Sequence, residues 1–174
     1  YLNGKNRKKE SITKYIEITP DNADLRQEIK TIYTGALSSM SRSQFRHLDD
    51  QKRFKSMEEY IANSYQTPTK LSSADFSGLE NSGDSTVVSS SFIVKDQVSE
   101  IGPLFAFKIN YIDQVVTINS FSTDERKYPI EYWNYENTDS YKTDIIIHAP
   151  KNKKFTGIPE SQNLSFSNMK YSST

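Results

Sequence analysis

Apolar residues recur at helical spacing near the start of the chain. In the segment 19–40, TPDNADLRQEIKTIYTGALSSM, spacings of four, three, four and four separate Leu25, Ile29, Ile32, Ala36 and Met40. A single apolar stripe of this kind is typical of an amphipathic helix that packs on a core. Pro20 suits the first helical position, and Thr19 can cap it. The pattern therefore predicts a helix over residues 19–40.

Two shorter helices are expected after this one. The first covers residues 44–50. The second starts at Ser56, because Ser56 and Glu59 have the spacing of a capping box, in which each side chain accepts a hydrogen bond from the backbone N–H of the other residue. Tyr60 and Ile61 then supply apolar side chains for packing.

Beyond Tyr65 apolar and polar residues alternate, which is the period of a β-strand. The runs KLSSADFSGLE and STVVSSSFIVKD are separated by a turn around Gly83. Val88, Phe92 and Val94 share one face of the second run. Together the two runs predict an antiparallel hairpin.

Three further runs predict strands. PLFAFKINY, residues 103–111, alternates most clearly, and QVVTINSF, residues 114–121, follows after a tight turn near Asp113. DIIIHAP, residues 144–150, offers one short strand that Pro150 ends. Helices first and antiparallel strands afterwards predict an α+β fold, with N-terminal helices packed on one face of a curved antiparallel sheet.

The length of 174 residues is that of one domain. We expect a polar, basic leader over residues 1–18, a single α+β domain over 19–150 and a loosely held polar tail over 151–174. The first residue is Tyr1 rather than Met, and we expect a membrane anchor upstream of it. The basic residues of the leader are interpreted as a solvated run rather than as a phosphate-binding site.

Composition excludes several kinds of chemistry. Cysteine is absent, which removes disulfides, thiolate metal sites and a cysteine nucleophile. The two histidines, His47 and His148, are far apart in the chain, and no metal or other cofactor is expected. The 22 basic and 22 acidic residues cancel, so direct nucleic-acid binding is not expected.

No catalytic signature is present in the sequence. The chain contains neither a G-x-S-x-G elbow nor a glycine-rich phosphate loop, and we predict that it is not an enzyme. Asp75, Asp113 and His148, which lie in or beside the expected strands, are the candidates for acid or base chemistry. The favoured interpretations are an outward strand residue, a turn former and a hydrogen-bonded edge residue, respectively.

Aromatic residues concentrate in YPIEYWNYENTDSY, residues 128–141, which holds four of the eleven tyrosines and the only tryptophan. Tyr132, Trp133 and Tyr135 cannot all face one side of a strand, so part of this set is expected to be exposed. Tyr and Trp combine apolar surface with a polar group, which suits protein interfaces. The candidate partner interface is therefore Tyr128, Tyr132, Trp133 and Tyr135, with domain core and a carbohydrate or other ligand site as alternatives.

The order of elements over about residues 19–148 resembles that of the nuclear transport factor two-like, or cystatin-like, fold: a leading helix, short helices and a four-stranded antiparallel sheet. Within that fold, this Lys-, Asn- and Ser-rich chain resembles the extracytoplasmic domain of the eighth VirB component of type IV secretion systems, in its Gram-positive, TcpC-like form. The chain has no N-P-x-G turn, so the resemblance assigns no contact residues.

The resemblance implies a non-enzymatic assembly scaffold of a conjugative DNA-transfer channel. Such a protein is held in the cell membrane by an anchor that is absent from this chain, and its extracytoplasmic domain contacts copies of itself and other channel subunits. Two alternatives stay open: a small-molecule enzyme of the isomerase or dehydratase type on the same fold, and a surface or cell-wall binding module that uses Trp133 and its neighbours. A deep pocket holding Asp75 or His148 would favour the enzyme.

Overall fold

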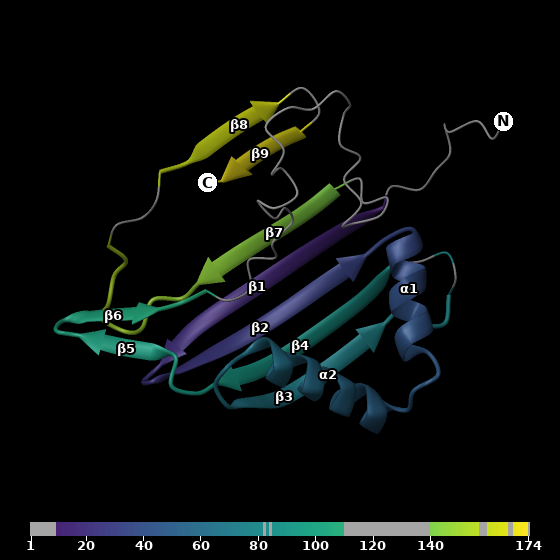
Figure 1. The fold of residues 1–174 in the computed structure, drawn as a ribbon, viewed down its shortest axis with the longest axis horizontal. Helices are drawn as coiled ribbons and strands as arrows, with labels where there is room; N and C mark the ends of the chain where they lie inside the picture. Colours follow the sequence, from purple (N-terminus) through teal and green to yellow (C-terminus); the bar gives the residue numbers. More distant parts are fainter. Residues whose placement is uncertain are drawn as a thin grey trace, which may run out of the picture.

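The structure, a computed structural model, describes residues 10–81, 83, 85–109, 140–156, 160–166 and 169–173. A five-stranded sheet dominates this part of the chain (Figure 1), with the strand order β3-β4-β2-β1-β7. Its strands are β1 (Ser11–Asp21), β2 (Asp24–Tyr33), β3 (Thr69–Ser77), β4 (Thr86–Val94) and β7 (Ser140–Ile147). Neighbouring strands are antiparallel except β1 and β7, which are parallel.

The described chain begins with a long hairpin of β1 and β2. Inward and outward side chains alternate along both strands, as the two-residue period of a strand requires. Asn22, with a φ of 56°, lies in the two-residue turn that joins them, where a positive φ matches the twist of the flanking strands. Every second residue of β1 from Ile12 to Pro20 is buried.

This hairpin corrects the predictions for the start of the chain. The helix expected over residues 19–40 is wrong for 19–33, which end β1, form the turn and make β2. The polar leader expected over residues 1–18 is wrong for 11–18, which form most of β1. The hairpin precedes both helices, so the described fold does not open with a helical segment.

The helix over residues 19–40 was wrongly predicted because part of its apolar spacing is also compatible with a strand. Leu25 and Ile29 are four residues apart, which places them on one face of a helix and equally on one face of a strand. Two further inward positions of β2 are polar, Gln27 and Thr31, and both are buried. Polar residues at inward positions disguise the alternation, and Ile32 lies on the opposite face of the sheet.

Two helices follow the hairpin, α1 (Ala36–Phe45) and α2 (Asp50–Ser64). Gly35 precedes α1 with a φ of 64°. Asp49 caps α2, because its Oδ1 accepts a hydrogen bond from the backbone N–H of Lys52 at 2.8 Å. Both helices pack on the same face of the sheet, over β2, β3 and β4 (Figure 1).

The helix boundaries differ from the predicted ones. Residues 46–49 separate the two helices, so the helix expected over 44–50 does not form as a unit. Ser56 lies inside α2 and does not cap its start. The carboxylate of Asp49 instead accepts the N–H of Lys52, and the helix therefore begins at Asp50, well before Ser56.

The hairpin predicted from residues 70–80 and 85–96 is confirmed by the antiparallel pairing of β3 with β4. Val88, Phe92 and Val94 are buried, as their alternation predicts. The register shifts at a bulge between Leu71 and Ser73.

Two small two-stranded sheets complete the described fold. They pair β5 (Val98–Ile101) with β6 (Leu104–Phe107) and β8 (Gln162–Phe166) with β9 (Met169–Ser173). β6 confirms part of the strand predicted over residues 103–111, and β7 confirms the short strand predicted before Pro150. Asp113 and the run 114–121 lie outside the described residues. The pair β8–β9 lies within the part of the chain expected to be a loosely held tail.

The core lies between the helices and the sheet. Its least exposed side chains come from both layers: Ile16, Ile18, Leu25, Ile61, Phe92 and Val94. A buried hydrogen bond crosses the same space, in which Tyr65 Oη donates to Gln27 Oε1 at 3.0 Å. The α+β class, with two helices packed on a mostly antiparallel sheet, is confirmed, and membership of the nuclear transport factor two-like fold stays a prediction.

Candidate functional site

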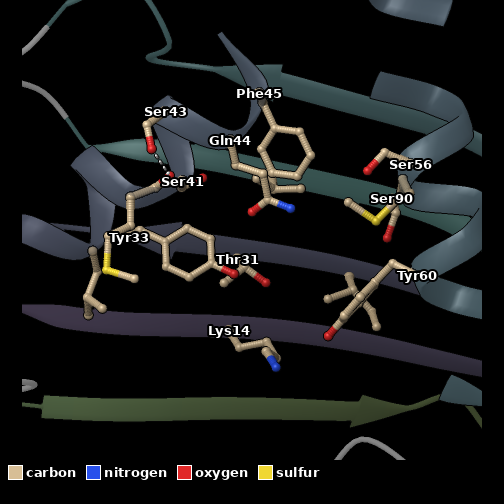
Figure 2. Close-up of a pocket in the computed structure, with 15 residues that line it drawn as sticks. Lys14, Thr31, Tyr33, Ser41, Ser43, Gln44, Phe45, Ser56, Tyr60 and Ser90 are labelled. Atoms are coloured by element: carbon tan, nitrogen blue, oxygen red, sulfur yellow. Dashed lines mark hydrogen bonds between the residues drawn. The ribbon is translucent and has the colours of Figure 1, made fainter. Parts of the chain in front are cut away.

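A cavity of about 460 Å³ lies between the helices and the sheet (Figure 2). Sites for small molecules usually have volumes of about 300–1,000 Å³. Side chains of β1, β2 and β4 form its floor, and α1 and α2 form its walls. The cavity is therefore large enough for a small organic molecule.

Lys14 is the one charged side chain among the described lining residues of this cavity. It occupies an inward position of β1 between Ile12 and Ile16, and 8% of it is exposed. A buried ammonium group is unfavourable unless polar or anionic groups surround it. The cation therefore marks one end of the cavity as polar.

Hydroxyl groups surround this part of the cavity. In Figure 2 the side chain of Tyr60 reaches from α2 toward Lys14, and the ring of Tyr33 points toward Thr31. A hydroxyl can donate and accept hydrogen bonds, so the three hydroxyls can orient a polar group of a ligand. Phe45 and Met57 add buried apolar side chains to the lining, and Ser43, Gln44, Ser56 and Ser90 add further polar ones.

Two exposed apolar side chains belong to the same cavity. Met40 of α1 is 67% exposed and Tyr60 of α2 is 57% exposed. Large exposed apolar groups beside a concavity are typical of a binding site. The unbranched, polarizable side chain of Met also adapts to ligands of different shape.

Ser41 contributes a buried hydroxyl to the lining. It lies on α1 and is 7% exposed, and its Oγ has no hydrogen-bond partner within the described part of the chain. Buried polar atoms are nearly always hydrogen-bonded, so a hydroxyl without a partner indicates a place for water or for a ligand atom.

The face of the sheet opposite the helices, which we call the helix-free face, is a second candidate surface. It is made of the outward side chains of β3, β4, β2, β1 and β7. In strand order, one row across it comprises Asp75, Ser89, Lys30, Tyr15 and Asp144, and the next comprises Ser73, Ser91, Glu28, Glu17 and Ile146. Tyr15 is 41% exposed and Ile146 is 52% exposed.

Polar contacts organise the β1–β7 side of this face. His148 Nε2 lies 3.0 Å from Glu17 Oε2 and so joins the end of β7 to β1. Lys142 Nζ donates to Asp144 Oδ2 at 2.7 Å and lies 6.0 Å from the centre of the Tyr15 ring. The hydrogen bond to Asp144 and the charge of that carboxylate raise the pKa of Lys142 above its ordinary value. All these groups are exposed, so the pairs orient side chains more than they stabilise the fold.

The candidates for acid or base chemistry do not come together. Asp75 is exposed on the helix-free face, and His148 is exposed just beyond β7. Neither residue lines the cavity. Their places agree with the favoured interpretations, an outward strand residue and a hydrogen-bonded edge residue. His47 is exposed between the two helices.

The predicted partner interface cannot be placed on either surface. Tyr128, Tyr132, Trp133 and Tyr135 lie outside the described residues, as does Asp113.

Sequence patterns alone do not reveal the cavity. Lys14 falls in the predicted leader, and Thr31 and Tyr33 fall in the predicted helix. The usable signal is the alternation over residues 12–18, in which Lys14 occupies a position of the apolar set. A charged residue in the apolar set of a strand indicates a buried cation.

These features define an α+β domain with a helix-covered cavity and an open sheet face. Comparisons with family models, with curated proteins and with solved structures find no match. In the described ranges, no helix has the length and apolar character needed to cross a bilayer. The described His, Asp and Glu side chains form no group of three or more that could hold a metal ion.

Proposed function

We propose that this chain is a non-enzymatic assembly domain that associates with a second copy of itself through the helix-free face. The observation that carries the proposal is the exposure of Tyr15 and Ile146 on the neighbouring strands β1 and β7. Aromatic and large apolar side chains surrounded by polar ones are typical of protein contact sites.

The charges of the helix-free face favour a partner of the same kind. Its basic side chains are Lys70, Arg26, Lys30 and Lys142, and its acidic side chains are Asp75, Glu28, Glu17, Asp144, Asp21 and Asp24. Charges of both signs are interspersed on this face, so a second copy can place opposite charges against them. Glu17 and Glu28 lie directly opposite each other on β1 and β2, and a basic side chain from the partner would offset their repulsion.

The helix-free face has the size that a stable dimer needs. Five strands spaced about 4.8 Å apart and roughly eight residues long cover an area of about 650 Å². Standard protein interfaces bury about 800 Å² on each partner, counted as accessible surface. Two such faces can therefore pack on one another in the manner of a β-sandwich.

The first test is the oligomeric state of the purified chain, measured by sedimentation velocity over a range of concentrations. We expect a reversible dimer, and we expect Ile146→Lys to raise its dissociation constant at least tenfold, because an ammonium would be buried in the contact. Ile101→Lys is the matched control, since Ile101 is 62% exposed on β5, outside the five-stranded sheet.

A wild-type chain that stays monomeric up to millimolar concentration would contradict the proposal. Equal dimerisation of Ile146→Lys and the wild type would exclude the helix-free face as the contact.

A role in a conjugative type IV secretion channel, on the outer side of the cell membrane, is the extension suggested by the order of elements. The predicted order began with a helix over residues 19–40. In the structure, residues 19–33 belong to the hairpin of β1 and β2 instead. The general α+β layout is the remaining support. The isomerase or dehydratase alternative asked for Asp75 or His148 in a pocket, and neither lines the cavity.

The extension is tested by cross-linking the full-length protein in membranes of its native cell and identifying the captured proteins by mass spectrometry. Recovery of the protein with other membrane channel subunits supports it, and loss of those subunits in Trp133→Ala would support the predicted aromatic interface. Recovery from the soluble fraction without such partners contradicts it.

A further inference from the structure

We propose that the tip of the β5–β6 hairpin inserts into the surface of an anionic lipid bilayer, while lysines beside the hairpin contact the lipid head groups. The tip comprises residues 101–104, Ile-Gly-Pro-Leu. In Figure 1 the hairpin extends beyond the ends of the strands of the five-stranded sheet, and its tip points away from them. The proposal is independent of self-association, because the hairpin lies outside the sheet that carries the helix-free face.

The tip is apolar and exposed. All four of its residues are exposed, and none of them has a polar side chain. Ile101 is 62% exposed and Leu104 is 53% exposed, and the two are paired across the hairpin, so their side chains lie on the same side of it. Tight turns usually carry Asn, Asp or Ser beside Gly and Pro. A turn with large apolar side chains instead is typical of a surface that leaves water when it binds.

The hairpin holds this tip in a fixed position. Gly102 has a φ of 59°, as tight two-residue turns require at such a place. At the other end of the hairpin Val98 is buried, and Phe107 packs against the core. The N–H of Val98 also donates to the carbonyl of Ala23 at 2.9 Å, which joins β5 to the turn between β1 and β2. Because the base is fixed, little ordering is needed when the tip binds.

The segment that follows β7 brings positive charge to the hairpin. Lys151, Lys153 and Lys154 are all exposed. Lys153 Nζ lies 4.3 Å from the centre of the Phe105 ring, so this segment contacts β6 at the residue next to the tip. The N–H of Lys153 donates to the carbonyl of Pro150 at 3.0 Å and closes a turn. The contact and the turn place a group of ammonium ions beside the apolar tip.

The charge balance selects an anionic bilayer as the partner. Residues 98–109 and 150–156 together contain four lysines and one carboxylate, Glu100. Each lysine close to an anionic membrane raises the affinity about fivefold. The long lysine side chains can keep their charge at the head groups while apolar side chains go deeper, and Phe155, which is 47% exposed, adds an aromatic ring to the same segment. The apolar tip alone would also suit a pocket on a protein, and the lysines favour the bilayer.

The experiment is flotation of the purified chain with vesicles of phosphatidylcholine alone and with vesicles that also contain about 30% phosphatidylglycerol. In about 0.1 M salt we expect the anionic vesicles to be bound about tenfold more tightly or better. In about 1 M salt most of this difference should disappear, because the Debye length falls to about 3 Å.

The apolar contribution is tested by the double variant Ile101→Ser and Leu104→Ser. It should bind the anionic vesicles about tenfold more weakly or worse, because neither side chain then gains from leaving water. Met40→Ser is the matched control, since Met40 is 67% exposed on α1, which lies at the other end of the sheet (Figure 1). All three positions are exposed, so the fold should be retained in both variants.

The charge contribution is tested by the double variant Lys151→Gln and Lys154→Gln. It should lose most of the preference for anionic vesicles, because two ammonium groups beside the hairpin are removed. Lys52→Gln with Lys55→Gln removes the same charge from exposed positions of α2 and should leave the preference intact.

A dye at the tip separates insertion from adsorption to the head groups. The chain contains no cysteine, so Leu104→Cys offers a single attachment point for an environment-sensitive fluorophore. Its emission should shift to the blue when anionic vesicles are added, whereas the same dye on Met40→Cys should show no shift.

Several results would overturn the proposal. These are no flotation of the folded wild type with anionic vesicles, equal binding to the two kinds of vesicle, equal effects of the tip and Met40 variants, or no emission shift from the tip. If the tip double variant lost the dimer instead of vesicle binding, the tip would be assigned to a protein contact, which would also overturn the proposal. Failure of the wild type to dimerise leaves the predicted flotation unchanged, so the two proposals fail separately.

Discussion

Gly78 follows β3 with a φ of 73°, in the left-handed region that glycine adopts without steric cost. A Cβ at this position would collide with the backbone carbonyl oxygen of Ser85. The carbonyl of Gly78 also accepts a hydrogen bond from Nε–H of the buried Arg42 at 3.1 Å, so the turn cannot easily move. At the residue scale we expect Gly78→Ala to lower the free energy of unfolding by about 4 kcal/mol or more, measured by urea denaturation.

Gly102→Ala is the control for this substitution. Gly102 has a φ of 59°, but a Cβ there would meet nothing within 4 Å. The change should therefore cost about 1–2 kcal/mol, from backbone strain alone. Equal losses in the two variants would show that the contact with Ser85 is unimportant.

At the scale of one element, α2 depends on the residue before it. Asp49 Oδ1 accepts the backbone N–H of Lys52 at 2.8 Å, and its Oδ2 lies 3.1 Å from Lys52 Nζ. These contacts hold the pKa of Asp49 below its ordinary value, with the backbone hydrogen bond as the largest cause. We expect Asp49→Ala to lower the melting temperature by a few degrees and to speed hydrogen exchange in the first turn of α2.

Asp50→Ala is the matched control, since it removes a neighbouring carboxylate and its ion pair with Arg53 at 3.0 Å but leaves the cap. Asp49→Ser should restore most of the stability, because a hydroxyl can accept the same N–H. If Asp50→Ala destabilised the protein more than Asp49→Ala, the cap would not be what starts this helix.

At the scale of the whole molecule, an ion pair connects the turn of the first hairpin to the end of the second. Lys95 Nζ donates to Asp24 Oδ2 at 2.6 Å, and the N–H of Asp96 donates to Asp24 Oδ1 at 3.2 Å. The hydrogen bond from Lys95 is the largest cause that lowers the pKa of Asp24. The carboxylate of Asp24 therefore binds a proton less readily in the folded protein than in the unfolded chain. The ion pair's contribution to stability is complete above the ordinary pKa of 3.8 and is lost as pH falls through the lower pKa of the folded state.

Asp24→Asn should therefore lower the urea midpoint at neutral pH and have little effect at pH well below 3.8. Asp75→Asn, a change of an exposed aspartate on β3, is the control. An equal effect of Asp24→Asn at both pH values would contradict the assigned role of the carboxylate.

The elements predicted correctly from the sequence are those whose apolar residues fit either the helical or the strand period, but not both. Val88, Phe92 and Val94 are separated by even numbers of residues, and no helix could place all three on one face, so β4 and its pairing with β3 were predictable. Leu25 and Ile29 satisfy both periods, and the inward Gln27 removed the signal that would have distinguished them. Whether a segment of this kind forms a helix or a strand is decided by the elements that pack against it.

The sequence by itself determined the α+β class, the second hairpin, the short strand before Pro150 and the absence of cysteine chemistry, because these depend on composition and on neighbouring residues. Only the tertiary structure decided that residues 11–33 form a hairpin, since burial of that hairpin's inward face involves α1 and α2, which follow it in the chain. The parallel pairing of β7 with β1 likewise joins residues that are distant in the chain. The cavity around Lys14 exists because two helices and three strands meet, and no local pattern encodes such a meeting.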